Sequence, residues 1–181
     1  VFSFHSVKNI TTGEGGAIVT DSKQIYEKLK LIRSHGREES LSYFSSVSTP
    51  KYVSIGYNWR ISSITAALAL SQLKKLNKLI KLRRKNAKYL SSKLKKHPEI
   101  LIPIEPKGYN HVYQLYSIIL DNNKLRNNLK EFLTKKGIMS KVFFEPIHLT
   151  DFYKKQIIKK KISLKNTENI SSKILTIPMF P

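Results

Sequence analysis

Cysteine is absent from the 181-residue sequence, and apolar runs are short. Without cysteine the chain has no disulfide framework and no thiolate metal site. No apolar stretch is long enough to cross a bilayer, and the first residues lack the basic and apolar regions of a secretory signal. We therefore expect a cytoplasmic protein without a membrane span. The chain begins with valine rather than methionine, which suggests a piece of something longer.

Acidic residues are also scarce, with 12 Asp and Glu against 33 Lys and Arg, and the formal net charge is +21. Such a charge is compatible with binding to nucleic acid or to an anionic membrane surface. Nucleic-acid-binding proteins, however, favour arginine forks and interleaved aromatic side chains. Here 27 lysines and six arginines are scattered among Ile, Asn and Leu. We favour a compositional bias on solvated helix faces, and we keep a non-catalytic basic interaction or nucleic-acid-binding protein as the alternative.

Hydrophobic residues make up 40% of the chain, enough for a folded core. In the first half, Gly15–Asp21 reads as a short buried strand. Ser22–Gly36 reads as a helix with Gly36 as its stop, and Arg37–Ser54 as a loop. A long helix is predicted from about Ser62 to Lys96, with apolar positions at helical spacing and lysines between them.

The second half alternates strands and helices. His111–Leu120 is rich in β-branched and aromatic residues and predicts a central strand. Asp121–Gly137 predicts a helix with an Asp/Asn start and a glycine end, and Ile138–Phe144 predicts another strand. The final 35 or so residues, by pattern, predict short helices and a proline-terminated tail. This order indicates an α/β layered lobe over residues 98–181.

The first 16 residues, VFSFHSVKNITTGEGG, place Lys8 between an aromatic run and a glycine-rich turn. An unprotonated lysine amine can form a Schiff base with an aldehyde, as enzymes that use pyridoxal phosphate (PLP) do with their cofactor. Apolar neighbours at Phe2, Phe4 and Val7 would help to keep such an amine dry. On these physical features alone, an ordinary surface lysine in a β-turn is the favoured interpretation.

The order of residues in this segment changes this interpretation. FSFHSVKNITTGEGGAIVT closely resembles the lysine segment of the DegT/StrS-type sugar aminotransferases, which are PLP enzymes of the aspartate aminotransferase fold. Five further signatures that resemble the family follow in the same order: RSHG at residue 33, GYNWRISSITAALALSQLKKL at 56, HVYQLYSIIL at 111, KKGIMSKVFFEPIHL at 135 and the closing TIPMFP. Six ordered matches are far more specific than one.

The resemblance implies an α/β fold in three parts. Residues 1–60 would be the C-terminal part of the PLP-binding large domain, whose N-terminal half is missing. Residues 61–97 would be a long interdomain helix, and residues 98–181 a small C-terminal α/β domain.

It also implies roles for individual residues. Lys8 matches the lysine that holds PLP and shuttles a proton, and Ser3 matches a serine that contacts the cofactor phosphate. Asn58 matches an asparagine that reaches the phosphate from the neighbouring subunit of a dimer. Arg60 lies beside it and is assigned to the same anionic site, with a structural ion pair as the alternative. His148 matches a histidine near the nucleotide-sugar site.

The remaining histidines receive less weight. His5 is expected to shape the pocket or to be a packed polar residue, whereas His35 and His111 are interpreted as structural. The five histidines show no spacing typical of a metal site, so no metal is expected.

The implied reaction transfers an amino group, usually from glutamate, to a ketosugar attached to a nucleotide. The full-length family also has a large stretch before the lysine segment, which supplies a phosphate-binding turn, an aromatic side chain on the ring and an aspartate at the ring nitrogen. This chain lacks that stretch, so we expect it to be inactive alone. A fragment, one subunit of a split enzyme and a non-catalytic remnant all remain open, as do a homodimer and a partner chain that supplies the first half.

Overall fold

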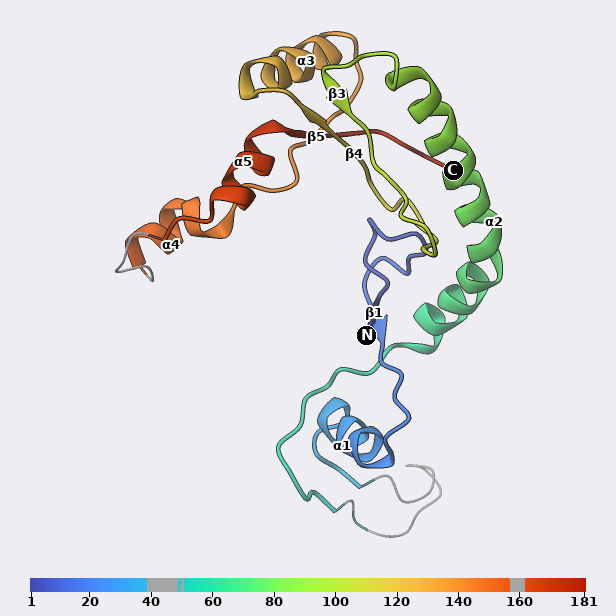
Figure 1. Ribbon diagram of the computed structural model, residues 1–181. Helices are drawn as coiled ribbons and strands as arrows, with labels where there is room; N and C mark the ends of the chain where they lie inside the picture. The colour runs from blue at the N-terminus through green and yellow to red at the C-terminus, as the bar shows by residue number, and fades with distance from the viewer. Residues whose placement is uncertain (39–48, 50, 157–161) are drawn as a thin grey trace. The chain divides into compact units, whose positions relative to one another are not determined.

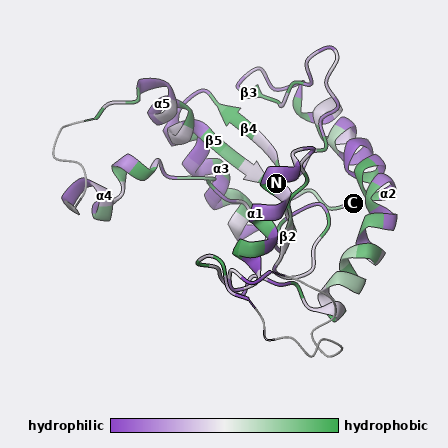
Figure 2. Cartoon of the chain, turned by 90° about the horizontal axis from the view of Figure 1, so that it is seen from below, coloured by the Kyte–Doolittle hydropathy of each residue, from purple (hydrophilic) through white to green (hydrophobic). Residues whose placement is uncertain are grey.

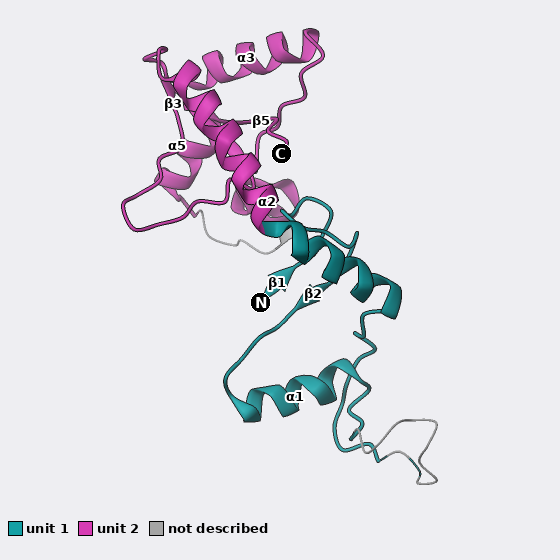
Figure 3. Ribbon diagram, turned by 90° about the vertical axis from the view of Figure 1, so that its right-hand side faces the viewer, with its two compact units in different colours: residues 1–76 teal, residues 77–181 magenta. Residues whose placement is uncertain are grey.

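The computed structural model describes residues 1–38, 49, 51–156 and 162–181. The chain divides into two compact units, residues 1–76 and 77–181 (Figure 3). The boundary falls inside the long helix α2 (Ser63–Leu94), so each unit contains part of it. Helix α2 confirms the helix predicted from about Ser62 to Lys96. Among the described residues, no helix is long and apolar enough to span a membrane.

Unit 1 contains a two-stranded antiparallel sheet and one further helix. Strand β1 (Phe2–Ser3) pairs with β2 (Gly16–Ala17). Helix α1 (Lys23–Arg33) begins after Ser22, whose hydroxyl accepts the Ile25 N–H at 3.3 Å, an N-cap contact. The helix ends as predicted near Gly36, which has a φ of +70° and donates its N–H to the Leu31 carbonyl at 2.8 Å.

The prediction of a buried strand over Gly15–Asp21 is wrong in extent and in burial. Only Gly16 and Ala17 are paired, and the side chains of Ile18 and Val19 are 51% and 71% exposed. The physical reason is that, beyond Ala17, no described strand pairs with Ile18 and Val19, and their side chains stay largely uncovered. Most of the loop predicted over Arg37–Ser54 lies outside the described residues; at its ends, Arg37 and Tyr52 form an isolated antiparallel bridge.

Unit 2 is built on a three-stranded antiparallel sheet in the order β3–β4–β5 (Figure 1). Its strands are β3 (Ile100–Leu101), β4 (Tyr116–Leu120) and β5 (Ile174–Ile177). Its other helices are α3 (Asn123–Lys135), the 3₁₀ helix η1 (Ile147–Leu149), α4 (Asp151–Gln156) and α5 (Lys165–Lys173). The predicted helix Asp121–Gly137 is confirmed as α3, with Asn122 as its N-cap.

The core lies in unit 2 and centres on the middle strand β4, whose C-terminal part is coloured as hydrophobic in Figure 2. Its fully buried hydrophobic members are Ala87, Tyr116, Ile118, Leu120 and Leu175. Alternate residues of β4 face this core, while α2 contributes Ala87 and α3 contributes partly buried leucines. The central-strand prediction is therefore confirmed for β4.

Three details of unit 2 differ from the sequence predictions. The central strand begins at Tyr116 rather than His111, because Tyr113 has a φ of +48° and turns the chain. Ile138–Phe144 is not a strand: only Lys141 pairs, as an isolated bridge to Thr176, and the side chain of Phe144 is 72% exposed and so lacks the burial that holds a strand. The final segment contains β5, which the pattern did not predict.

Candidate functional site

The segment around Lys8 is a loop closed by backbone hydrogen bonds. The Phe4 N–H donates to the Gly15 carbonyl at 2.9 Å, and the Thr12 N–H donates to the Phe4 carbonyl at 3.0 Å. The same Phe4 carbonyl accepts the Thr11 hydroxyl at 2.9 Å. These contacts join the two ends of the segment, so that Lys8 lies within a loop fixed at its base.

Glycine is required where the loop closes. A Cβ on Gly16 would lie 2.7 Å from the Phe2 carbonyl oxygen, which is backbone and cannot move aside without breaking the β1–β2 pair. Gly15 has a φ of +140°, which side-chain-bearing residues rarely adopt. The glycines noted in the sequence therefore have a steric role in bringing the return strand against β1.

Lys8 is half-buried, and its N–H donates to the His5 carbonyl at 2.9 Å. Its amine forms no salt bridge with any described residue, so no carboxylate of that part of the chain occupies it. The expected apolar enclosure is incomplete, because Phe2 and Val7 are 57% and 56% exposed. This chain fixes the backbone of the lysine but does not by itself exclude water from it.

Ser3 and His5 contact each other in this loop. The Ser3 hydroxyl oxygen accepts the His5 N–H at 3.3 Å, and the His5 Nδ1 accepts the Val7 N–H at 3.4 Å. The His5 Nε2 lies 3.5 Å from a Glu14 carboxylate oxygen. The histidine thus links Ser3, Val7 and Glu14 within the loop, and its role in shaping a pocket stays a prediction. The Ser3 hydroxyl hydrogen remains available to an acceptor.

Asn58 and Arg60 lie at the C-terminal end of α1. Backbone N–H groups of Tyr57 and Trp59 donate to carbonyls of that helix's last turn, at 2.6 and 2.9 Å. The Asn58 Oδ1 accepts the Arg60 Nε–H at 3.0 Å. The close approach depends on Gly56, since a Cβ there would lie 2.0 Å from a backbone nitrogen.

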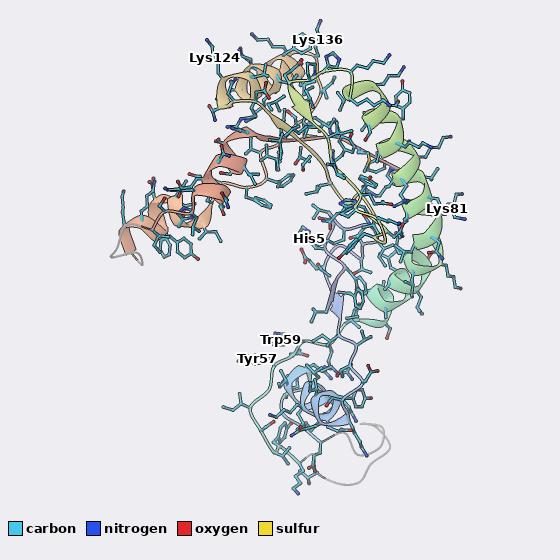
Figure 4. All side chains as sticks on the ribbon, in the orientation of Figure 1. His5, Tyr57, Trp59, Lys81, Lys124 and Lys136 are labelled. Atoms are coloured by element: carbon cyan, nitrogen blue, oxygen red, sulfur yellow. The ribbon has the colours of Figure 1, made fainter. Side chains whose placement is uncertain are left out.

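Among the described residues, no hydrogen bond joins the Asn58–Arg60 pair to the Lys8 loop. Figure 4 shows His5 well apart from the neighbouring rings of Tyr57 and Trp59, which stack with centroids 4.2 Å apart. Asn58 lies between those two aromatic residues in the sequence, whereas His5 belongs to the Lys8 loop. Ile61, which follows Arg60, lies close to the base of the loop, since a Cβ on Gly15 would lie 3.7 Å from the Ile61 Cδ1.

His148 belongs to unit 2, in η1. Its Nε2 lies 3.0 Å from the Glu168 Oε1, which also accepts the Leu164 N–H at 2.7 Å. The imidazole is 9% exposed. The structure thus gives this histidine a carboxylate partner on α5 that sequence reasoning did not identify.

The sequence analysis also did not identify that two adjacent arginine side chains of α2 are held in place by hydrogen bonds. Arg83 is buried, and its Nη1 donates to the carbonyls of Tyr113 and Gln114 at 3.2 and 3.3 Å. Burial lowers the pKa of Arg83, whereas the hydrogen bond to Glu105 raises the pKa of Arg84 and lowers that of Glu105. Arg83 precedes buried Ala87 by one helical turn, a spacing that could have placed it on the inner face.

The outer face of α2 carries a regular row of exposed lysines, among them Lys81, which points away from the helix in Figure 4. Successive members are four or three residues apart, so they share one side of the helix over about 21 Å. Helix α2 contains no acidic residue. The row consists of Lys74, Lys78, Lys81, Lys85 and Lys88. These are five of the 33 Lys and Arg residues, and they form a solvated helix face.

Comparison with known proteins gives one consistent result. Residues 1–181 match the DegT/DnrJ/EryC1/StrS aminotransferase family. Over 181 residues the chain is 35% identical to the UDP-4-amino-4,6-dideoxy-N-acetyl-beta-L-altrosamine transaminase of Campylobacter jejuni, covering 98% of this chain and 46% of that protein.

Two solved structures have closely similar folds. Helicobacter pylori PseC, an aminotransferase involved in pseudoaminic acid biosynthesis, is 32% identical with a TM-score of 0.87, over 99% of this chain and 47% of that one. Escherichia coli GDP-4-keto-6-deoxy-D-mannose-3-dehydratase with bound hydrated PLP is 30% identical with a TM-score of 0.81, over 99% and 49%. The chain thus spans about half the length of the relatives it matches. With its whole length matched by the family model, this α/β chain belongs to the DegT/DnrJ/EryC1/StrS aminotransferase family.

Proposed function

We propose that this chain is the Lys8-bearing half of a PLP-dependent aminotransferase that transfers an amino group, from glutamate, to a nucleotide-linked ketosugar in the cytoplasm. The observation that carries the proposal is the closed loop that holds Lys8, with no carboxylate of the described residues paired to its amine, in a chain matched by the family over its whole length. Residues 1–60 would complete the large domain, residues 61–97 would link it to the rest, and residues 98–181 would form the small domain.

The donor set of the loop fits PLP chemically. A lysine amine can capture an aldehyde, and a serine hydroxyl can donate to a phosphate oxygen. PLP, when bound, supplies the ring that accepts the electrons of a substrate carbanion. Lys8 would hold the cofactor through its amine and, once released, act as the base that moves a proton at the substrate carbon. Ser3 would fix the phosphate, and the His5 contacts would keep Ser3 and Lys8 in register.

Asn58 and Arg60 would serve the anionic site of a neighbouring subunit. The resemblance of the GYNWR segment to the family supports this assignment, and the hydrogen bond between Asn58 and Arg60 would let the two side chains act together. We therefore propose a homodimer of the completed enzyme. His148 would contact the sugar nucleotide, with Glu168 fixing the orientation of its ring.

The lysine row on α2 is the feature that the alternative, a basic nucleic-acid-binding protein, would use. That alternative predicts binding to DNA of any sequence that weakens steeply with salt. The family match and the Lys8 loop favour the enzyme.

Reductive trapping tests the proposal. The chain is mixed with PLP, reduced with borohydride, digested and mapped by mass spectrometry, both alone and with the remainder of the large domain. The label is expected on Lys8 and is expected to disappear in Lys8→Arg. Lys81→Arg, on the exposed face of α2, is the matched control and should leave the labelling unchanged.

Label spread evenly over surface lysines, and equal in the Lys8→Arg variant, would refute the assignment of Lys8. Because one relative is a dehydratase, nitrogen transfer should be followed directly in the completed enzyme, as amino-sugar formation from glutamate.

A further inference from the structure

Helix α2 concentrates positive charge without any compensating acidic residue. Residues 41–98 contain neither aspartate nor glutamate, although the chain has 12 acidic residues. The other lysine-rich helices do pair their charges: Lys30 lies 3.6 Å from Glu27 in α1, and Lys135 lies 2.8 Å from Glu131 in α3. A lysine-rich composition applies to all three helices, so it does not by itself explain why α2 lacks such pairs.

The lysine row places this charge along one line of the helix. Four of its five members, Lys78, Lys81, Lys85 and Lys88, belong to unit 2 and are exposed, and Figure 4 shows Lys81 directed away from the helix. None of the four forms a salt bridge with a described residue. Side chains three or four residues apart on a helix are neighbours, so these ammonium groups repel one another. A partner that carries several negative charges along its surface would remove this repulsion.

The kind of anionic partner follows from which cations α2 presents. The two arginines of the helix are engaged within unit 2, since Arg83 donates to backbone carbonyls and Arg84 donates to the Glu105 carboxylate. The planar guanidinium fork that suits the phosphates and bases of nucleic acids is thereby occupied, and the row offers only ammonium groups. Ammonium groups attract an anionic surface without paired hydrogen bonds of fixed geometry, as lysine clusters on helices do with acidic lipid headgroups.

Tyr89 borders the lysine row. It follows Lys85 by one helical turn and is 62% exposed, and the Lys93 Nζ lies 5.5 Å from the centre of its ring. Tyrosine combines an apolar ring with a polar hydroxyl, and such side chains are enriched at the boundary between lipid and water. A single aromatic side chain beside a line of lysines suits a lipid surface better than a series of stacked bases, which needs several.

We propose that the lysine row is a peripheral docking surface for an anionic lipid bilayer, with Tyr89 at the edge of the contact. The attraction of an anionic bilayer falls off within a Debye length, about 10 Å at 0.1 M salt, so the row lies directly against the headgroups when it is bound. The contact is reversible, because it depends on charge rather than on insertion of a hydrophobic segment. This inference goes beyond the proposed function and does not depend on Lys8.

Vesicle sedimentation tests the proposal with the whole chain. The vesicles consist of phosphatidylcholine alone or of equal parts of phosphatidylcholine and phosphatidylglycerol, and the bound fraction is measured at increasing salt. We expect binding to the anionic vesicles only, and we expect added salt to weaken it. Near an anionic bilayer each lysine contributes about fivefold in affinity, so combining Lys78→Gln, Lys81→Gln, Lys85→Gln and Lys88→Gln should weaken binding by roughly a hundredfold or more.

The matched control makes the same change in net charge away from the row. It replaces four exposed lysines of unit 2 by glutamine, namely Lys107, Lys124, Lys130 and Lys136. Figure 4 shows Lys124 and Lys136 on α3 rather than on α2, where Lys81 lies. This control should bind the anionic vesicles within about twofold of the unmodified chain, because its lost charges lie off the contact surface. Circular dichroism checks that both variants keep the helix content of the unmodified chain.

Three results would overturn the proposal. Equal binding to neutral and anionic vesicles would assign the contact to exposed apolar surface, and equal losses in the two quadruple variants would assign it to total charge. Loss of duplex DNA binding in the row variant, with vesicle binding retained, would make nucleic acid the partner. Reductive labelling of Lys8 should be unchanged in the row variant, so a failed docking surface and a failed Lys8 assignment give different results.

Discussion

Replacing Tyr116 by phenylalanine should reveal how α2 is fastened to the central strand. The ring of Tyr116 is fully buried, and its hydroxyl lies 2.7 Å from the Ser91 hydroxyl of α2. Phenylalanine keeps the ring in the core and removes only this hydrogen bond. A neutral hydrogen bond contributes about 0.5–1.5 kcal/mol, so Tyr116→Phe should lower the free energy of unfolding of unit 2 by about 1 kcal/mol.

A double-mutant cycle isolates that bond. Ser91→Ala alone should cost a similar amount, and the double variant should cost little more than either single one, with a coupling of about 0.5–1 kcal/mol. Tyr109→Phe is the matched control, since Tyr109 is 71% exposed and should change stability by less than about 0.5 kcal/mol. Hydrogen exchange of the β4 and β5 amides measures the stability of this unit.

The same tyrosine predicts a dependence on alkaline pH. Burial raises the pKa of Tyr116 above its ordinary value, and the Ser91 hydrogen bond opposes this only in part. The unfolded chain therefore loses the phenolic proton first. The contribution of the buried Tyr116 phenol to folding stability is complete below about pH 10 and is lost as the pH rises through the pKa that Tyr116 has in the folded state. Tyr116→Phe should lack this component of the alkaline loss.

Two results would refute this account of the core. One is a coupling between Tyr116 and Ser91 indistinguishable from zero. The other is a loss of stability in Tyr109→Phe equal to that in Tyr116→Phe, because burial would then not decide the cost.

Two further predictions concern unit 2. Leu175→Ala should destabilise the unit by about 2–5 kcal/mol, because Leu175 is fully buried on β5, whereas Leu101→Ala should cost much less, because Leu101 on β3 is 61% exposed. Urea unfolding followed by circular dichroism compares the two variants. Equal losses of stability would contradict the placement of the core. The hydrogen bond from Arg84 lowers the pKa of the Glu105 carboxyl. The contribution of this ion pair to folding stability is therefore present above the ordinary pKa near 4.5 and is lost as the pH falls through the lowered pKa. Glu105→Gln should remove this acid-sensitive component, and a difference between the two proteins that stays constant from pH 7 to pH 3 would exclude it.

The sequence alone determined the elements whose signals are local. The Asp/Asn start of the helix predicted over Asp121–Gly137 was such a signal, because the Asn122 side chain caps a nearby N–H group, and Gly36 and Gly137 marked helix ends because their backbones turn left-handed. The order of short motifs likewise identified the family and placed Lys8 in its loop, since both depend on neighbouring residues.

Contacts between distant residues were decided only by the tertiary structure. The start of β4 depended on Tyr113 and on Arg83, which lies 30 residues away, and the carboxylate partner of His148 came from Glu168 on another helix. No local pattern records such pairings.

The largest difference between the sequence predictions and the structure also arises from contacts between distant residues. Residues 15–21 carry the composition of a buried strand, and that composition is correct for a sheet interior. A strand becomes buried only when other segments pair with it and cover it, and in unit 1 no described residue does so at Ile18 and Val19. Sequence fixes what a segment is suited to contact, whereas the tertiary structure decides whether that contact is made.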